Sequence, residues 1–294
     1  QIQKANTRSQ NFLISWIFLG AKPSLSRVED IQIPGRKVSI PARVYVPRDD
    51  ANLPLTVFFH GGGWVTCNLD THDIMCRRIA QEVETIVVSV AYRLAPWHKF
   101  PTPLHDCYDA LTWLAQNADS LNLRHSAFGV AGDSAGGNLA TSVALMLKEK
   151  ASPRLDYQVL LYPAVDGTLS CESHERLKDA PLLNQSAIQF YRNAYARSQT
   201  DWTDPYFSPL LAKELTGLPP ALIMTAGLDP LHDEAEAYAQ RLEKSQVPVD
   251  YIDYPEMVHG FMHFPRFCSD SASAFTKIAD FIRRQTGLDS GVLS

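Results

Sequence analysis

Short apolar runs alternate with longer segments of helical periodicity along most of the chain. The first two runs, at residues 28–33 and 38–46, alternate apolar with polar positions across a Pro34-Gly35 turn, which predicts an antiparallel hairpin. The later runs are almost continuously apolar, as is typical of strands covered on both faces of a sheet. They lie at residues 55–59, 86–91, 128–131, 157–161, 221–225 and 249–254.

Segments of helical periodicity separate these runs and follow the last of them. This alternation indicates βαβ units, so we expect an α/β fold with a mostly parallel sheet flanked by helices. The helical segments lie at residues 70–83, 103–117, 135–150, 233–246 and 271–286.

Two stretches depart from the alternation. Almost sixty residues between Pro163 and Ala221 contain no expected strand, and only residues 185–196 there form an expected helix. A segment of that length in a compact domain usually forms a lid or a binding element. Residues 12–20 are apolar on all sides but too short to cross a bilayer, which favours a helix buried in the protein or packed in a lid over a targeting or membrane role.

Composition narrows the class of protein. The 294 residues contain 27 Lys and Arg against 32 Asp and Glu, a net charge of −5, so neither nucleic acid nor an anionic membrane is an expected partner. The five cysteines show neither a disulfide framework nor zinc-ligand spacing, which favours a reducing compartment such as the cytoplasm.

The segment Gly132-Asp-Ser-Ala-Gly136 lies between the expected strand at 128–131 and the expected helix at 135–150. A G-x-S-x-G sequence in that position is typical of a sharp turn that presents a nucleophilic serine, here Ser134. The alternative is that Ser134 only caps the helix, since serine hydroxyls often accept bonds from first-turn amides.

The segment His60-Gly-Gly-Gly-Trp64 follows the strand at 55–59. Three consecutive glycines let main-chain N–H groups turn toward one point, which predicts an oxyanion hole formed by Gly62, Gly63 and the amide of Ala135. A flexible turn and a phosphate loop are the alternatives, but the Lys-Ser/Thr pair of a phosphate loop is absent. We expect His60 to orient this loop and Asp133 to make local hydrogen bonds.

A nucleophilic serine needs a base and an orienting acid, which in such a sheet follow later strands. Asp229 and His259 are the candidates for acid and base. Asp233 is a second candidate acid, although we interpret it as the cap of the next helix, and His263 is a second candidate base. A metal-binding pair of His259 and His263 is a further alternative, but no third ligand is evident, so no metal is expected. The other histidines, interpreted as surface or structural residues, are at 72, 98, 105, 125, 174 and 232.

Together these stretches resemble the hormone-sensitive lipase group of α/β-hydrolases, the bacterial family IV carboxylesterases. The matching segments are His60–Trp64, Asp70–Asp73, Ala91–Pro96, Gly132–Gly137, Ser208–Leu210, Asp229–Glu234 and His259–Phe261. The resemblance implies an α/β-hydrolase fold with an eight-stranded, mostly parallel sheet and a helical cap. Its implied division is an N-terminal cap helix region that leads into the first strands at 1–45, a core at 46–166 and 206–294, and a cap insertion at 167–205.

The resemblance also implies a carboxylesterase that hydrolyses short- to medium-chain esters of small molecules through a Ser-His-Asp triad and an acyl-enzyme, without a cofactor. An amidase or peptidase on the same fold is an alternative. A small-molecule receptor is another, but related receptors lack the catalytic histidine, and His259 is present. The resemblance leaves a homodimer open. Aromatic candidates for the substrate pocket are Trp64, Phe190, Tyr191, Trp202, Phe207 and Phe261.

Two positions depart from the family pattern. Trp97 stands where the family usually has Glu, and Cys67-Asn68 stands where it often has small residues. We expect both positions near the rim of the pocket, where they bear on substrate preference rather than on catalysis.

Overall fold

A computed structural model describes residues 22–49, 52–123, 125–150 and 152–287. Its eight strands form one sheet in the order β1-β2-β4-β3-β5-β6-β7-β8. β2 pairs antiparallel with both β1 and β4, and all later pairs are parallel. The predicted sheet is confirmed. Its strands are β1 Arg27–Pro34, β2 Ser39–Val46, β3 Leu53–Phe59, β4 Ile86–Val90, β5 His125–Asp133, β6 Tyr157–Leu161, β7 Ala221–Leu228 and β8 Val249–Val258.

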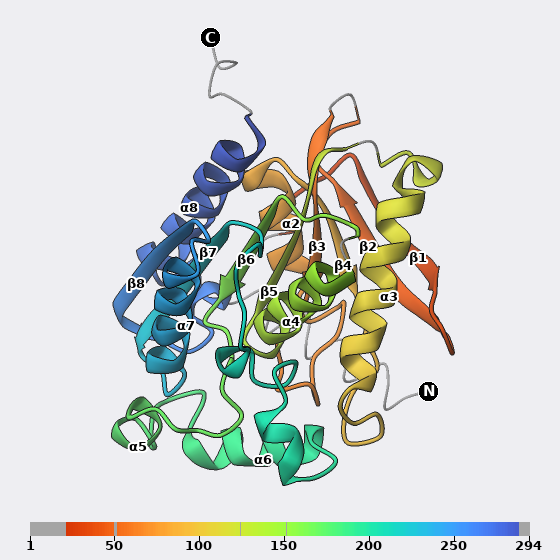
Figure 1. Cartoon of the computed structure of the whole chain (residues 1–294). Helices are drawn as coiled ribbons and strands as arrows, with labels where there is room; N and C mark the ends of the chain where they lie inside the picture. The colour runs from red at the N-terminus through yellow and green to blue at the C-terminus, as the bar shows by residue number, and fades with distance from the viewer. Residues whose placement is uncertain (1–21, 50–51, 124, 151, 288–294) are drawn as a thin grey trace, which may run out of the picture.

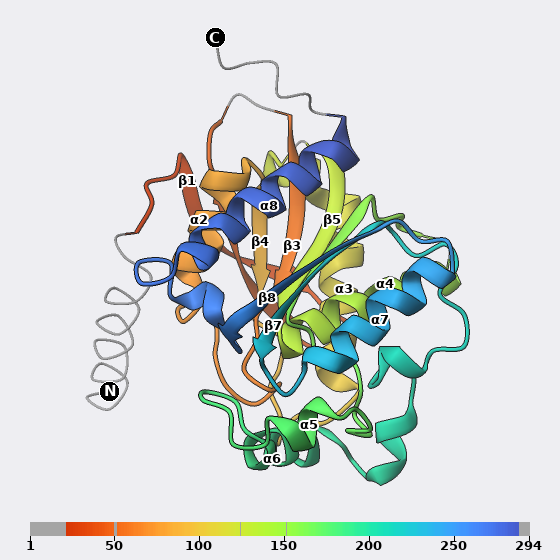
Figure 2. The same cartoon turned by 90° about the vertical axis from the view of Figure 1, so that its left-hand side faces the viewer.

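Helices cover both faces of the sheet (Figures 1 and 2). Buried side chains of α2 and α8 pack in one apolar cluster with one face of the sheet, and those of α3, α4 and α7 pack in another with the opposite face. This arrangement explains the nearly continuous apolar runs of the parallel strands. The helices are α2 Asp73–Val83, α3 Thr102–Asn117, α4 Ala135–Lys150, α7 His232–Lys244 and α8 Ser269–Thr286, and a 3₁₀ turn, η1 Ala118–Leu121, follows α3.

The interval between β6 and β7 contains helices and turns but no strand. It forms α5 Ser173–Arg176, α6 Gln185–Tyr195, η2 Gln199–Thr203 and η3 Pro209–Leu211. Both views place α5 and α6 beyond the end of the sheet toward which β7 points (Figures 1 and 2). The expected helix at 12–20 lies outside the described residues. Within the described ranges, no helix combines the length and apolarity needed to span a membrane.

The predicted elements differ from the structure mainly at their ends. α2 begins at Asp73 rather than at residue 70, because the side-chain oxygen of Asn68 accepts the N–H groups of Asp70 and Thr71 and holds them in a turn. β8 continues to Val258, which pairs with Leu228 of β7. The Asn68 turn is a local side-chain contact and the Val258–Leu228 pair joins two strands, and hydrophobic periodicity records neither of them.

Gly129 of β5 leaves room for the ring of Tyr157 on the neighbouring strand. A Cβ atom at Gly129 would lie 2.1 Å from Cε2 of Tyr157, a fully buried residue. The Tyr157 hydroxyl is fixed by a 2.8 Å hydrogen bond with Oγ1 of Thr56 on β3. The ring therefore has little freedom to move away.

We predict that Gly129→Ala lowers the free energy of unfolding by about 3 kcal/mol, because the new methyl group overpacks a rigid part of the core. Gly217→Ala is the control: its φ of +82° strains an alanine, but no atom lies within 4 Å of the added methyl group, and the cost is about 1 kcal/mol. Urea unfolding of both variants measures the difference. Equal losses would show that Tyr157 yields easily.

Candidate active site

Ser134 lies in a sharp turn between β5 and α4. Its φ of 53° is in the left-handed region, which L residues adopt only under constraint. A Cβ atom at Gly136 would lie 1.9 Å from the carbonyl oxygen of Phe59, so the start of α4 approaches the end of β3 only because residue 136 is glycine. The turn exposes the Ser134 side chain at the carboxyl end of the sheet.

His259 lies between Ser134 and Asp229. Its Nε2 is 2.9 Å from Oγ of Ser134, and its Nδ1 is 2.6 Å from Oδ2 of Asp229. The buried Asp229 carboxylate can only accept, so His259 donates its Nδ1–H and leaves the Nε2 lone pair facing the serine hydroxyl. The other Asp229 oxygen accepts the N–H of Leu231 at 2.9 Å, which fixes the carboxylate.

These three residues come from distant parts of the sequence. Ser134 follows β5, Asp229 follows β7 and His259 follows β8, and parallel strands end at the same edge of a sheet. The ring of Tyr162 packs edge-on against that of His259, with centroids 5.0 Å apart. The structure thus brings together the three side chains that sequence analysis selected.

The glycine loop is held beside Ser134 by buried polar contacts. The N–H of Gly61 donates to Oδ1 of Asp133 at 2.8 Å, and Nδ1 of His60 is 2.7 Å from the carbonyl oxygen of Gly61. The Tyr92 hydroxyl donates to the carbonyl oxygen of His60 at 2.6 Å. Burial lowers the pKa of His60 to about 4, so its ring is neutral at pH 7. His60 and Asp133 therefore make the local contacts expected of them.

Gly62 and Gly63 have φ values of 111° and 60°, and they line cavities that also contain Ser134. Ala135 is the first residue of α4, so its N–H has no acceptor within the helix. The three residues predicted to form the oxyanion hole thus line the cavities that Ser134 lines.

Two cavities meet at Ser134. The smaller has a volume of about 40 Å³ and the larger about 570 Å³. Gly63, Ser134, Leu183 and Tyr191 line both, whereas His259 lines only the larger. The serine therefore has access to two spaces of very different size.

Three of the six aromatic pocket candidates line the smaller cavity: Trp64, Tyr191 and Phe207. The other three line neither cavity. Phe190 is 61% exposed, because successive residues of α6 point about 100° apart and Tyr191 faces inward. The guanidinium carbon of Arg192 lies over the Trp202 ring, 3.8 Å from the ring centroid. Phe261 is buried against Tyr162 and Tyr254.

The alternative acid and base lie elsewhere. Asp233 does not cap α7, because Leu231 holds the cap position; its carboxylate instead accepts the N–H of Ser173 and a bond from Arg176, which ties α7 to α5. His263 contacts Asp133 through Nε2 at 3.6 Å rather than reaching Ser134.

Glu234 and His174 form a buried pair that sequence analysis missed. Glu234 accepts the N–H groups of Val165 and Asp166, and its second oxygen is 2.7 Å from Nε2 of His174 in α5. Burial raises the pKa of the Glu234 carboxyl group. Burial alone would lower the pKa of His174, but the neighbouring Glu234 carboxylate has the larger effect, so the pKa of His174 is raised. The pair links the core to the insertion. The only signal of this pair in the sequence is that Glu234 is a second acidic residue directly after Asp233.

The family model described as the alpha/beta hydrolase fold matches residues 56–263 of this chain. That match covers more than half of the sequence and includes all three side chains of the hydrogen-bonded set. The chain belongs to the α/β-hydrolase family. Within this family it falls in the hormone-sensitive lipase-like group, which confirms the resemblance.

Individual α/β-hydrolases are similar over most of their length. The carboxylic ester hydrolase LipN of Mycobacterium tuberculosis is 39% identical over 87% of this chain and 70% of its own. The ethyl acetate hydrolase of Pseudomonas putida is 36% identical over 84% of this chain and 79% of its own. The hyperthermophilic esterase of the archaeon Pyrobaculum calidifontis superposes with a TM-score of 0.90 at 39% identity, covering 97% of this chain and 93% of that one.

The two departures from the family pattern lie in different surroundings. Trp97 is 88% exposed and lines neither cavity, so it was wrongly expected at the pocket rim. Cys67 does line the larger cavity. All five cysteines lie in the described part of this α/β-hydrolase, and all are free thiols.

The depressed pKa of His60 predicts a pH dependence of stability. An unfolded chain binds a proton at this histidine below about pH 6.5, whereas the folded protein resists protonation down to about pH 4. As the pH falls, the unfolded state binds a proton at His60 before the folded state does. Protonation of His60 should therefore lower the free energy of unfolding by roughly 2 to 3 kcal/mol between those pH values.

Urea unfolding at pH 7 and pH 4.5 measures this loss. A His60→Asn variant, neutral at both pH values, should show a smaller difference between them even if it is less stable overall. The same difference in both proteins would mean that His60 is not the group that titrates.

Proposed function

We propose that this α/β-hydrolase is a serine carboxylesterase that hydrolyses short- to medium-chain esters of small molecules. Ser134 is the nucleophile, His259 the general base and Asp229 the residue that orients it. The observation that supports these roles is the unbroken chain of hydrogen bonds from Asp229 through His259 to Ser134, at 2.6 and 2.9 Å. Distances of this length suit proton transfer.

In the first step His259 takes the Ser134 proton as Oγ attacks the ester carbonyl carbon. The carbonyl oxygen becomes an oxyanion, and the amides of Gly62, Gly63 and Ala135 are proposed to stabilise it. Such preoriented donors stabilise the transition state more than the substrate, which is what accelerates the reaction. Asp229 stabilises the imidazolium that forms.

We use the position of His259 to assign the alcohol and acyl groups of the ester to the two cavities. The protonated ring must deliver its proton to the departing alkoxide, so the alcohol group of the ester has to lie on the side of His259. His259 lines the larger cavity and not the smaller. We therefore assign the alcohol group to the larger cavity and the acyl group to the smaller. Water then enters after the alcohol leaves and hydrolyses the acyl-enzyme.

We propose that the insertion at 167–205 acts as a cap that limits acyl length over a core at 46–166 and 206–294, to which β1 and β2 contribute two strands of the sheet. Ile188 and Tyr191 of α6 line the smaller cavity. Ile188 packs there with Leu183 and Leu231, the latter from the core. A cavity of about 40 Å³ favours short acyl chains over long ones. Relatives named carboxylic ester hydrolase, ethyl acetate hydrolase and carboxylesterase support ester hydrolysis as the reaction.

Ser134→Ala should lower kcat for p-nitrophenyl acetate by about 10⁴-fold or more, since it removes the nucleophile. Ser273→Ala, which changes an exposed serine of α8, is the control and should retain wild-type rates. Steady-state kinetics with purified variants measure both. Hydrolysis by Ser134→Ala at a rate near that of the wild type would refute the proposed role of Ser134.

Ile188→Ala should shift the preferred p-nitrophenyl ester toward a longer acyl chain, because it enlarges the far side of the smaller cavity. Wild type should prefer acetate or butyrate over octanoate. Leu211→Ala removes a similar volume from a residue that lines neither cavity and should keep the wild-type preference. The readout is kcat/KM across the series. An unchanged preference in Ile188→Ala would mean that the acyl group lies elsewhere.

A further inference from the structure

A second set of converging side chains lies beside the triad in the larger cavity. Nε2 of His72 is 3.3 Å from both oxygens of Asp133, and Nε2 of His263 is 3.6 Å from Oδ2 of the same carboxylate. The three ligand atoms all lie within 4.8 Å of one another. All three residues line the cavity that contains Ser134 and His259, so a small ion can reach them from the substrate side.

The far nitrogen of the His72 ring also has a partner. Its Nδ1 is 3.1 Å from the Thr71 hydroxyl, which is itself 2.9 Å from the carbonyl oxygen of Asn68. Nδ1 can donate its hydrogen to that hydroxyl, and in this tautomer Nε2 presents a lone pair toward the Asp133 carboxylate, 3.3 Å away. Two acceptors placed in this way can share a cation.

His263 supplies a second imidazole. Its Nε2 is 3.6 Å from Oδ2 of Asp133, the oxygen that also lies 3.3 Å from Nε2 of His72. Two imidazoles and a carboxylate are donors that divalent first-row transition metals prefer.

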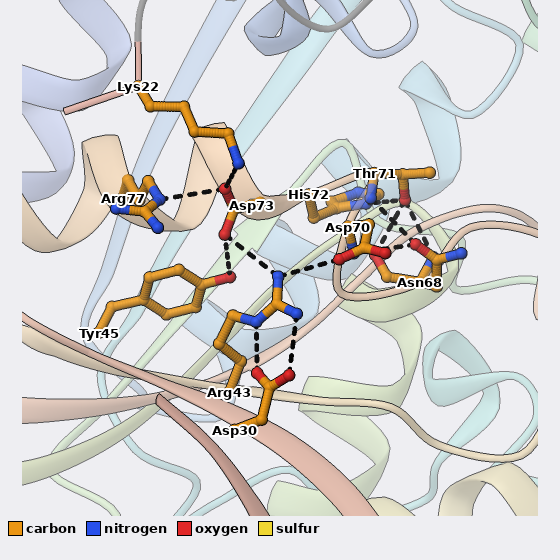
Figure 3. A network of polar contacts seen from close by, with 10 residues as sticks. All are labelled: Lys22, Asp30, Arg43, Tyr45, Asn68, Asp70, Thr71, His72, Asp73 and Arg77. Carbon is orange, nitrogen blue, oxygen red and sulfur yellow. Dashed lines mark hydrogen bonds and ion pairs between the residues drawn. The ribbon is translucent and has the colours of Figure 1, made fainter. Parts of the chain in front are cut away.

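The chain on both sides of His72 is fixed by polar contacts (Figure 3). On one side the Asn68 side chain accepts two backbone N–H groups of the turn. On the other, the Asp73 carboxylate accepts from Arg77, Tyr45 and Arg43. Asp133 is held separately by the N–H of Gly61 through Oδ1. Two of the three donors are thus positioned in advance, and a second partner on the far ring nitrogen is usual for metal-binding histidines.

The spacing fits a tetrahedral ion. Ligands about 2.1 Å from a zinc ion lie about 3.4 Å apart, close to the 3.3 and 3.6 Å between Asp133 and the two histidines. The two imidazole nitrogens lie within 4.8 Å of each other and have to reach the same separation around the ion. His263 lies in the 3₁₀ turn η4 Phe261–His263, and its side chain is 26% exposed, so it has more freedom to adjust than the buried His72.

We propose that His72, Asp133 and His263 form a binding site for one divalent first-row transition metal ion, with a fourth position open to the cavity, and that its occupation inhibits ester hydrolysis. Binding itself is independent of the proposed function, whereas inhibition rests on it. A doubly charged ion beside His259 disfavours the imidazolium that must form when Ser134 loses its proton. It also occupies space assigned to the alcohol group.

Calorimetric titration of chelator-treated protein with Zn²⁺ tests the site. Wild type should bind one ion, and His263→Ala should bind at least about tenfold more weakly, since losing even an outer contact of a metal ligand weakens binding by that factor. His105→Ala, which changes a half-buried histidine of α3 outside both cavities, is the matched control and should bind like wild type. Zn²⁺ should also raise the Tm of wild type but not that of His263→Ala.

Two further variants separate the outcomes. Ser134→Ala should bind Zn²⁺ like wild type although it is inactive, so a failure of the proposed function leaves the binding result interpretable. Cys67→Ser tests the thiol that lines the same cavity. Unchanged binding in His263→Ala, or loss of binding in Cys67→Ser alone, would overturn the site. Zn²⁺ that binds wild type at these residues without inhibiting p-nitrophenyl acetate hydrolysis would overturn the inhibitory role.

Discussion

The strained turn at Ser134 is the constraint on which the rest of the site depends. A left-handed φ of 53° at a non-glycine residue costs energy, and the surrounding packing holds it. Gly136 permits that packing because any side chain there would collide with the backbone of β3. The same turn places Asp133 beneath the glycine loop, where it accepts the Gly61 N–H. One turn thus positions both the nucleophile and the loop proposed to stabilise the oxyanion.

The insertion between β6 and β7 is attached to this core by charged and polar contacts rather than by apolar packing alone. Asp233 and Glu234, adjacent on the first turn of α7, bind α5 through Ser173 and His174. Because Asp229 lies only a few residues earlier, the segment that orients His259 also anchors the proposed cap. Substrate selection and catalysis therefore depend on one short stretch of chain.

Much of this arrangement could be predicted from the sequence, for identifiable reasons. Apolar runs covered on both faces indicated the strands, and the glycines around Ser134 and before Trp64 marked places where the backbone needs unusual freedom or close approach. Chain order then selected Asp229 and His259. The convergence of His72 and His263 on Asp133 could not be predicted, because they lie 61 and 130 positions away from it in the sequence and no spacing pattern joins them. Which aromatic residues line a cavity depended on the rotation of α6, and this is why Phe190 was wrongly grouped with Tyr191.

Covalent trapping shows whether Ser134 is the nucleophile that His259 activates. Diethyl p-nitrophenyl phosphate transfers its diethylphosphoryl group to an activated serine and releases p-nitrophenol, and peptide mass spectrometry locates the adduct. One adduct per chain is expected, on Ser134, formed in step with the loss of esterase activity and greatly slowed in His259→Gln. An adduct on another residue, or full loss of activity with Ser134 unmodified, would contradict it.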